Sequence, residues 1–152
     1  MAQPVSTFQV HTLTEAFAKA HAATLLGFSD DLAWDDWTTD NLLYPLPEKW
    51  RHSRYVAAPD GPPVAYAIIS RKQDSLHLHH IVVKPDYRSG GAPSLGRLLV
   101  DDLVASARAA GCARVTLKVM AENPRAASFY LRYGFQEKPS GAAGVRAFEF
   151  SL

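Results

Sequence analysis

A strand, a glycine-rich loop, a long helix and a second strand follow one another in the second half of the chain, and this succession leaves few folds open. β-branched residues near the end of Leu76–Val83 predict the first strand. Apolar residues then recur at helical spacing from Leu95 to Ala107, and this helix is expected to end at Gly111. The second strand is expected over Val115–Val119. Such a unit forms a right-handed crossover between two parallel strands.

Shorter elements are expected on both sides of this unit. Before it we expect a strand over Phe8–Val10, a helix from a capping Thr12 to Gly27, a second helix within Ser29–Tyr44, and strands over Arg54–Ala58 and Val64–Ser70. After it we expect a helix over Pro124–Tyr133 and strands over Phe135–Glu137 and Val145–Phe150. The expected fold is a single α/β (α+β) domain over residues 1–152, with a central mixed, mostly antiparallel twisted sheet and helices on both faces.

Length, charge and cysteine content exclude several classes of protein. The 152 residues fit one domain of roughly 150. A net charge of +1 gives no electrostatic case for binding nucleic acid or an anionic membrane. Cys112 is the only cysteine, so no intramolecular disulfide and no cysteine-based metal cluster can form. With no signal peptide pattern at the N-terminus and no apolar run of about 20 residues, we expect a cytoplasmic protein.

The loop before the long helix has the layout of an anion site. The strand that ends with Ile81–Val83 leads through Arg88 and a glycine-rich stretch to a helix that starts near Ser94. Backbone N–H groups of such a loop can surround a pyrophosphate, and Arg88 and Arg97 would add positive charge. The stretch is neither a Walker A loop nor a good dinucleotide fingerprint, so a connection whose glycines serve only as turn residues remains the alternative.

A second motif lies about forty residues further on. Asn123 is expected to cap the helix Pro124–Tyr133, along which Phe129 and Tyr130 are spaced on adjoining faces. Taken alone, this motif also fits a core helix with buried aromatic residues.

Together the two motifs resemble the GNAT N-acetyltransferases. The family pattern N-x-x-A-x-x-[FL]-Y-x-x-x-G-F is met at Asn123, Ala126, Phe129, Tyr130, Gly134 and Phe135. The lead V-x-P-x-[YF]-[RQ] into the coenzyme loop is met at Val83, Pro85, Tyr87 and Arg88. The resemblance covers Leu76 to Phe135. It implies direct transfer of an acetyl group from acetyl-CoA, as co-substrate, to a primary amine of a small molecule or peptide within a ternary complex.

The resemblance also implies roles for individual residues. The pantetheine arm would add to Ile81, Val82 and Val83 like an extra β-strand, and Tyr130 would be the general acid that protonates the coenzyme sulfur. The other implied coenzyme contacts are Arg88, Ser89, Gly90, Gly91, Ser94, Leu95, Gly96, Arg97, Asn123 and Phe129. This chain departs from the family pattern where Pro93 replaces a Gly or Ala, which indicates a loop about three residues longer.

A general base is expected on the strand Leu76–Val83. His77 and His79 are two residues apart and therefore expected on one face, with His80 on the other. Histidine titrates in the useful range, so His79 is the first candidate and His77 the second, with a structural histidine as the alternative. A His-x-His pair is also typical of metal sites, but no third ligand stands at an informative spacing, so we expect no metal.

The acceptor site is expected in the acidic, aromatic segment from Asp30 to Asp40. Carboxylates beside tryptophans, here Trp34, Asp35 and Trp37, suit a cationic amine through ion pairing and cation–π contact. The alternative is a solvated acidic helix face anchored by its tryptophans.

A rival function is a non-catalytic acyl-CoA sensor, which the lengthened loop and the absence of a carboxylate on the strand Leu76–Val83 leave open. A homodimer is possible in either case.

Overall fold

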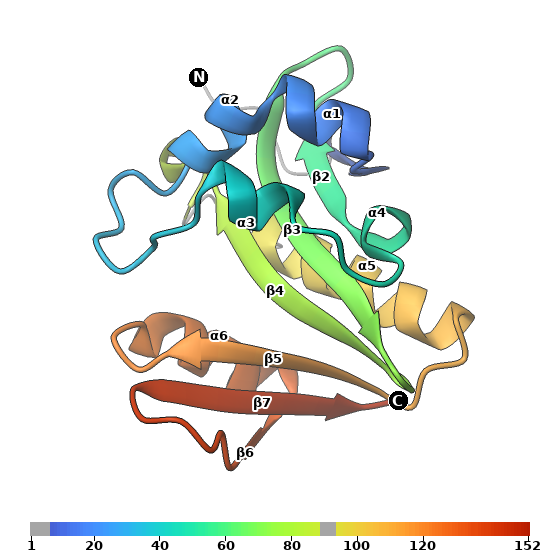
Figure 1. Ribbon diagram of the computed structural model, residues 1–152, viewed down its shortest axis with the longest axis vertical. Helices are drawn as coiled ribbons and strands as arrows, with labels where there is room; N and C mark the ends of the chain where they lie inside the picture. Colours follow the sequence, from blue (N-terminus) through green and yellow to red (C-terminus); the bar gives the residue numbers. More distant parts are fainter. Residues whose placement is uncertain (1–6, 89–93) are drawn as a thin grey trace.

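A computed structural model describes residues 7–88 and 94–152 of the chain. Within these residues one seven-stranded sheet crosses the molecule in the order β1-β2-β3-β4-β5-β7-β6 (Figure 1). The strands are β1 (Gln9–Thr12), β2 (Arg54–Ala57), β3 (Pro63–Lys72), β4 (Ser75–Val83), β5 (Arg114–Met120), β6 (Gln136–Lys138) and β7 (Val145–Ser151). Only β4 and β5 pair in parallel, and the other neighbours are antiparallel. The predicted mixed, mostly antiparallel sheet is confirmed.

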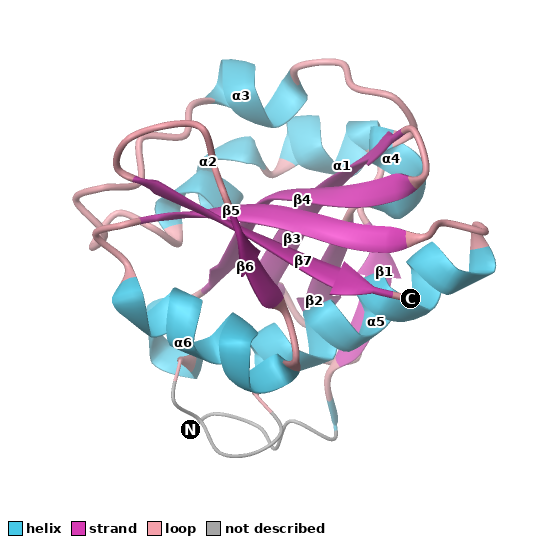
Figure 2. Cartoon of the chain, turned by 90° about the horizontal axis from the view of Figure 1, so that it is seen from below, coloured by secondary structure: helices cyan, strands magenta, loops and turns pink. Residues whose placement is uncertain are grey.

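Helices cover both faces of the sheet, as predicted (Figure 2). They are α1 (Glu15–Ala20), α2 (Ala22–Gly27), α3 (Thr39–Leu43), α4 (Lys49–His52), α5 (Leu95–Ala109) and α6 (Pro124–Tyr133), with one turn of 3-10 helix, η2 (Pro85–Tyr87). Residues of α5 and α6 belong to one buried cluster, and residues of α1, α2 and α3 belong to a second cluster across the sheet.

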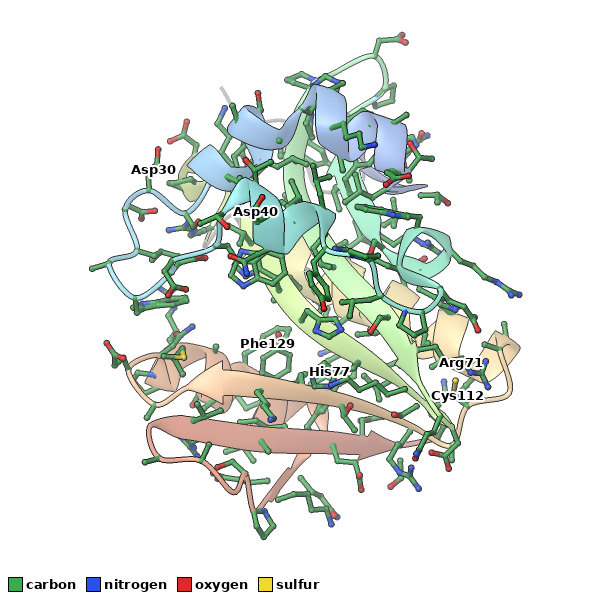
Figure 3. All side chains as sticks on the ribbon, viewed as in Figure 1. Asp30, Asp40, Arg71, His77, Cys112 and Phe129 are labelled. Atoms are coloured by element: carbon green, nitrogen blue, oxygen red, sulfur yellow. The ribbon has the colours of Figure 1, made fainter. Side chains whose placement is uncertain are left out.

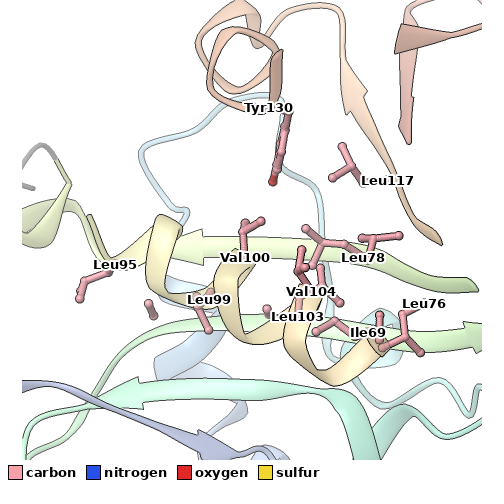
Figure 4. Close-up of a cluster of buried hydrophobic side chains, with 14 of the residues drawn as sticks. Ile69, Leu76, Leu78, Leu95, Leu99, Val100, Leu103, Val104, Leu117 and Tyr130 are labelled. Carbon is pink, nitrogen blue, oxygen red and sulfur yellow. The ribbon is translucent and has the colours of Figure 1, made fainter. Parts of the chain in front are cut away.

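The long helix α5 is placed by its apolar stripe. Leu95, Leu99 and Leu103 are each at most 2% exposed and pack against the sheet (Figure 4). Their partners include Leu76 and Leu117 on the two parallel strands. Burying each such leucine stabilises the fold by roughly 1.5–3 kcal/mol, so the predicted crossover rests mainly on this contact.

The first predicted helix is in fact two short helices. Thr12 pairs with Arg54 in the β1–β2 ladder, so its backbone is extended and cannot begin a helix. The cap is Thr14, whose hydroxyl oxygen accepts a hydrogen bond from the N–H of Phe17 at 3.1 Å. The helix is interrupted at His21, which ends α1 and precedes α2.

The second predicted helix, Ser29–Tyr44, is wrong for most of its length, because only α3 is helical. Thr38 caps α3 through a capping box with Asn41. Just before it, the carboxylate of Asp35 accepts a hydrogen bond from the N–H of Trp37 at 3.2 Å. Such a local side-chain bond competes with the helical pattern. The acidic segment before α3 is therefore an irregular loop.

A β-bulge interrupts the pairing of β3 with β4. Ile68 pairs with His80, whereas the next residue, Ile69, pairs with Leu78. His79 is thus one extra residue on β4, and the alternation of faces shifts by one position there.

Substituting Gly134 tests how firmly α6 is fixed at its end. Its φ of 121° is rarely adopted by other residues, and an added Cβ would lie 3.3 Å from Cε2 of Phe150. Gly134→Ala is expected to lower the free energy of unfolding by about 1–3 kcal/mol, measured by urea denaturation. Gly111→Ala is the matched control, because Gly111 also has a positive φ (73°) but would bring its Cβ within 4 Å of nothing in the described structure. Equal losses in the two variants would show that contact with Phe150 contributes nothing.

Candidate functional site

The two parallel strands separate and open a cleft. β4 and β5 pair only from Ser75–Arg114 to Leu78–Leu117, and beyond that point they diverge (Figure 1). A cleft of about 310 Å³ lies at the divergence. It is lined by Trp34, Asp35, Asp36, Trp37, Leu78, His79, His80, Ile81, Leu117, Lys118, Val119, Met120, Asn123, Ala126, Tyr130 and Val145.

Tyr130 reaches the cleft from α6. Figure 4 shows its ring extending from the helix towards β4, with the hydroxyl at the tip. Phe135 and Phe148 pack around the ring, with centroids 5.3 and 6.2 Å away, and Tyr130 is only 4% exposed. Burial raises the pKa of Tyr130, so the phenol keeps its proton across the physiological range.

The two histidines predicted as base candidates lie side by side, but only one lines the cleft. Their ring centroids are 4.7 Å apart. Nδ1 of His77, whose side chain is labelled in Figure 3, lies 2.7 Å from Oγ1 of Thr116. His77 is not among the described residues that line the cleft. His79 does line it, with Nε2 2.6 Å from Oγ of Ser70. Burial lowers the pKa of His77 to about 3 and that of His79 to about 4, so both rings are neutral at pH 7.

His80 lies on the same face as the other two histidines, so the prediction that it points to the opposite face is wrong. Because of the bulge, its ring comes to the face of the second buried cluster and stacks on Trp37, with centroids 4.2 Å apart and planes 5° from parallel. Its Nε2 lies 3.3 Å from Oδ2 of Asp35. Burial lowers the pKa of His80 to about 4, against the opposing effect of Asp35 and Asp36. Sequence alternation gave no signal for this placement.

The segment predicted to hold the acceptor does reach the cleft. Trp34, Asp35 and Trp37 all line it, although the segment is a loop and not the expected helix. The side chain of Asp35 is only 2% exposed, whereas the neighbouring Asp36 is exposed. The alternative, a solvated acidic helix face, does not describe Asp35.

The sequence alone did not predict that residues of β5 line the cleft. Leu117, the last residue of β5 paired with β4, lines the cleft. Lys118, Val119 and Met120 also line it, because β5 continues past the end of that pairing. A strand longer than its neighbour's ladder is a tertiary property, so no local pattern identifies it.

The predicted coenzyme loop is described only at its two ends, since Ser89, Gly90 and Gly91 lie outside the described residues. At the far end, Oγ of Ser94 accepts a hydrogen bond from the N–H of Arg97 at 3.0 Å and caps α5. The first turn of α5, including Leu95 and Gly96, thus presents the positive end of a 15-residue helix at this point.

The two predicted arginines have partners within the protein. Arg88 donates hydrogen bonds to the carbonyl oxygens of Val83 (2.7 Å) and Phe28 (2.8 Å) and to Asp31 (2.7 Å). It joins the end of β4 to the segment after α2, and its bond holds the pKa of Asp31 below the usual range. Arg97 lies 3.6 Å from Asp101 and stacks over the ring of Tyr133 at 4.6 Å.

The remaining predicted coenzyme residues divide between cleft and core. Ile81 and Asn123 line the cleft, and Oδ1 of Asn123 accepts a hydrogen bond from the N–H of Ala126 at the start of α6. Val82 belongs to the second buried cluster, and Phe129 packs between Tyr130 and Tyr133 without lining the cleft. Val83 packs against the first cluster.

Over residues 7–88 and 94–152, no group of three or more histidine, cysteine or acidic side chains is placed to hold a metal ion. Within the same residues, no helix combines the length and apolar character needed to cross a bilayer.

Comparison with known proteins agrees with this geometry. An uncharacterised N-acetyltransferase of Methanocaldococcus jannaschii is 31% identical over 102 residues, which are 59% of this chain and 44% of that protein. The chain thus spans less than half the length of this relative. Among solved structures, Ard1 of Thermoplasma volcanium matches with a TM-score of 0.79 at 16% identity, over 96% of this chain and 98% of that one. The PaiA N-acetyltransferase of Thermoplasma acidophilum, solved with coenzyme A, matches with a TM-score of 0.74 at 13% identity, over 95% and 99%.

These two structural matches have low sequence identity and show a shared fold. Membership of a family is shown by the sequence, because the model of the acetyltransferase (GNAT) family matches residues 15–135. That range includes β4, α5, β5 and α6, the elements that build the cleft and hold Tyr130. The chain belongs to the GNAT family of acetyltransferases.

Proposed function

We propose that this protein is an N-acetyltransferase that moves an acetyl group from acetyl-CoA directly to a primary amine of a small molecule or peptide. The observation that carries the proposal is the opening between β4 and β5 with Tyr130 in its wall. Such an opening leaves backbone groups of β4 without a strand partner on that side. A thioester and its pantetheine arm can take the place of the missing strand.

The coenzyme is expected to lie along the end of β4 and at the start of α5. Ile81, Val82 and Val83 lie beyond Leu78, the last residue of β4 that pairs with β5, and would hydrogen-bond the pantetheine arm. The diphosphate would lie at the N-terminus of α5, where Ser94 and Gly96 begin the helix after the glycine-rich loop. The match to the fold of a protein solved with coenzyme A supports this placement.

The reaction needs a neutral amine, stabilisation of an oxyanion and a proton for the departing thiolate. Unpaired N–H groups of β4 would stabilise the oxyanion. Tyr130 would donate its proton to the sulfur, since its hydroxyl is carried to the cleft by α6. A β4 histidine that lines the cleft would accept the proton of the incoming ammonium; His79 and His80 meet that condition, whereas His77 does not line the cleft.

The acceptor is expected to enter past the loop that carries Trp34 and Trp37. These two rings, with the carboxylates of Asp35 and Asp36, line the same cleft as Tyr130. Aromatic faces and carboxylates both favour a cationic amine over an anionic acceptor.

Two measurements on the purified protein test the proposal. Titration calorimetry with acetyl-CoA should show saturable binding, and a thiol-release assay with a panel of primary amines should show amine-dependent release of coenzyme A. A non-catalytic acyl-CoA sensor would bind without releasing thiol. Absence of binding at saturating acetyl-CoA would refute the whole assignment.

A further inference from the structure

Three buried polar atoms without hydrogen-bond partners lie together beside the cleft. Among the described residues, the buried side-chain atoms that lack a partner are Oδ2 of Asp35, the hydroxyl of Tyr66 and Nε2 of His80. They come from the loop after α2, from β3 and from β4. An unpartnered polar atom in a protein interior costs about 1–3 kcal/mol, so three at one place indicate a purpose beyond packing.

His80 contacts both of the other residues. Nε2 of His80 lies 3.3 Å from Oδ2 of Asp35, and the side chains are 9% and 2% exposed. The centroids of the Tyr66 and His80 rings are 5.6 Å apart. Burial, and to a lesser extent the charge of Asp35, raise the pKa of Tyr66, which is fully buried, so this phenol keeps its proton. The Asp35 carboxylate is thus approached by the imidazole nitrogen of His80, with the ring of Tyr66 packed beside that imidazole.

Proton placement on the imidazole follows from these neighbours. A carboxylate only accepts hydrogen bonds, so the proton of neutral His80 is favoured on Nε2, where it can be donated to Asp35. The lone pair is then on Nδ1, in a ring that lines the cleft. Stacking on Trp37 fixes the plane of the ring. A carboxylate that holds an imidazole in one tautomer and stabilises its protonated form is a recurring device for general bases.

We propose that His80 is the general base of the acetyl transfer and that Asp35, whose Oδ2 lies 3.3 Å from its Nε2, is the positioning residue. This inference rests on the proposed function and names the residue that prepares the amine. His79 is less suited, because its Nε2 already contacts Ser70 at 2.6 Å and no carboxylate faces it in the described structure.

The proton and electron movements balance as follows. Nδ1 of His80 takes one proton from the ammonium of the acceptor, and the free amine attacks the thioester carbonyl to form a C–N bond. The tetrahedral intermediate collapses with cleavage of the C–S bond, and Tyr130 gives its proton to the departing thiolate. The nitrogen of the new amide loses its extra proton to the tyrosinate, and His80 releases the first proton to solvent. The products are an N-acetylamine and free coenzyme A.

The charged and titratable groups around His80 come from every neighbouring element. Asp35 and Asp36 belong to the loop, Tyr66 to β3, His79 to β4, Lys118 to β5 and Tyr130 to α6. Asp35 and Asp36 raise the pKa of His80, whereas burial lowers it by more. The ring is therefore neutral when an ammonium arrives, and Asp35 stabilises the charge that the ring gains.

Steady-state kinetics from pH 6.5 to pH 9 test the base. For the wild type, kcat/KM is expected to change little with pH below the pKa of the amine, because His80 can deprotonate the ammonium in the complex. His80→Gln is expected to lower kcat/KM at pH 7 by about 100- to 10,000-fold. The variant should then regain about tenfold per pH unit, because only amine already neutral in solution reacts. Asp35→Asn should lower kcat/KM at pH 7 about 100-fold, and its kcat/KM should rise with pH as steeply as that of His80→Gln.

Matched variants and a second readout exclude a merely structural role. Asp60→Asn, in the exposed turn between β2 and β3, should keep wild-type kinetics, and all variants should keep the wild-type affinity for acetyl-CoA. A flat pH profile for His80→Gln, or a sloping one for His79→Gln alone, would overturn the assignment. Long-range ¹H–¹⁵N correlation spectra of the wild type should show the Nε2–H tautomer of His80, and the Nδ1–H tautomer would refute the pairing with Asp35. A wild type inactive towards every amine would overturn the proposed function and the base role with it, while the spectra would still decide the pairing.

Discussion

Acidification from pH 7 to pH 5 is expected to destabilise this protein severely, because three neighbouring histidines of β4 are buried in their neutral form. Burial lowers the pKa of His77 to about 3, and those of His79 and His80 to about 4. In the unfolded chain each ring has a pKa near 6.5. The unfolded state therefore binds protons at a pH where the folded state does not.

The sign and size of the effect follow from this difference. A histidine with a lowered folded pKa contributes stability that is present above about pH 6.5 and lost as the pH falls towards the folded value. Each one costs about 1.4 kcal/mol per pH unit in that window. From pH 7 to pH 5 the three together remove on the order of 6 kcal/mol, which is comparable with the whole stability of many domains.

Urea denaturation followed by far-UV circular dichroism at half-unit steps of pH measures this effect. The double variant His77→Gln, His79→Gln should show a clearly shallower loss of stability between pH 6.5 and pH 5 than the wild type. His11→Gln, His21→Gln removes two histidines outside β4 and should keep the wild-type slope. A wild type as stable at pH 5 as at pH 7 would show that the β4 histidines are protonated in the folded state.

The elements predicted correctly are those in which a local pattern and the tertiary contact agree. The periodic leucines of α5 are buried as their spacing predicts, and Asn123 caps α6 with Gly134 at its end. The strands β2, β3 and β4 likewise lie close to the ranges expected for them. In these places the sequence pattern is itself the cause of the structure.

The errors lie where a distant contact outweighs a local pattern. Thr12 and Glu15 have the spacing of a capping box, but pairing of Thr12 with β2 moves the cap to Thr14. A helix was expected within the acidic segment, yet packing of Trp37 on His80 and the bond from its N–H to Asp35 favour a loop.

The candidate site was predicted in part for the same reason. Tyr130, His79 and Trp37 could be named from motifs and composition, and all three line the cleft. His80 was assigned to the wrong face, because alternation with a period of two holds only in a strand without a bulge. The buried pair it forms with Asp35 joins residues 45 positions apart, and no local pattern relates them.

Replacing Tyr130 with phenylalanine is expected to lower kcat by about 100- to 10,000-fold while leaving the affinity for acetyl-CoA unchanged. The substitution removes one hydroxyl and keeps the ring that packs against Phe135 and Phe148. Burial raises the pKa of the phenol, which by itself makes it a weaker acid. The thiolate released into the same buried cleft also becomes more basic through desolvation, so the proton transfer stays nearly balanced.

Thiol release under saturating substrates gives kcat, and titration calorimetry gives the coenzyme affinity. Tyr133→Phe is the matched control, because Tyr133 lies on the same helix and donates its hydroxyl to Asp101 at 2.6 Å, outside the cleft. Its loss of a hydroxyl should leave kcat within about twofold of the wild type, since surface hydrogen bonds of this kind contribute only about 1 kcal/mol to stability and nothing to the transition state. If Tyr130→Phe also kept wild-type kcat, the thiolate would have to leave without a proton from α6, and the placement of Tyr130 in the cleft wall would be a matter of packing alone.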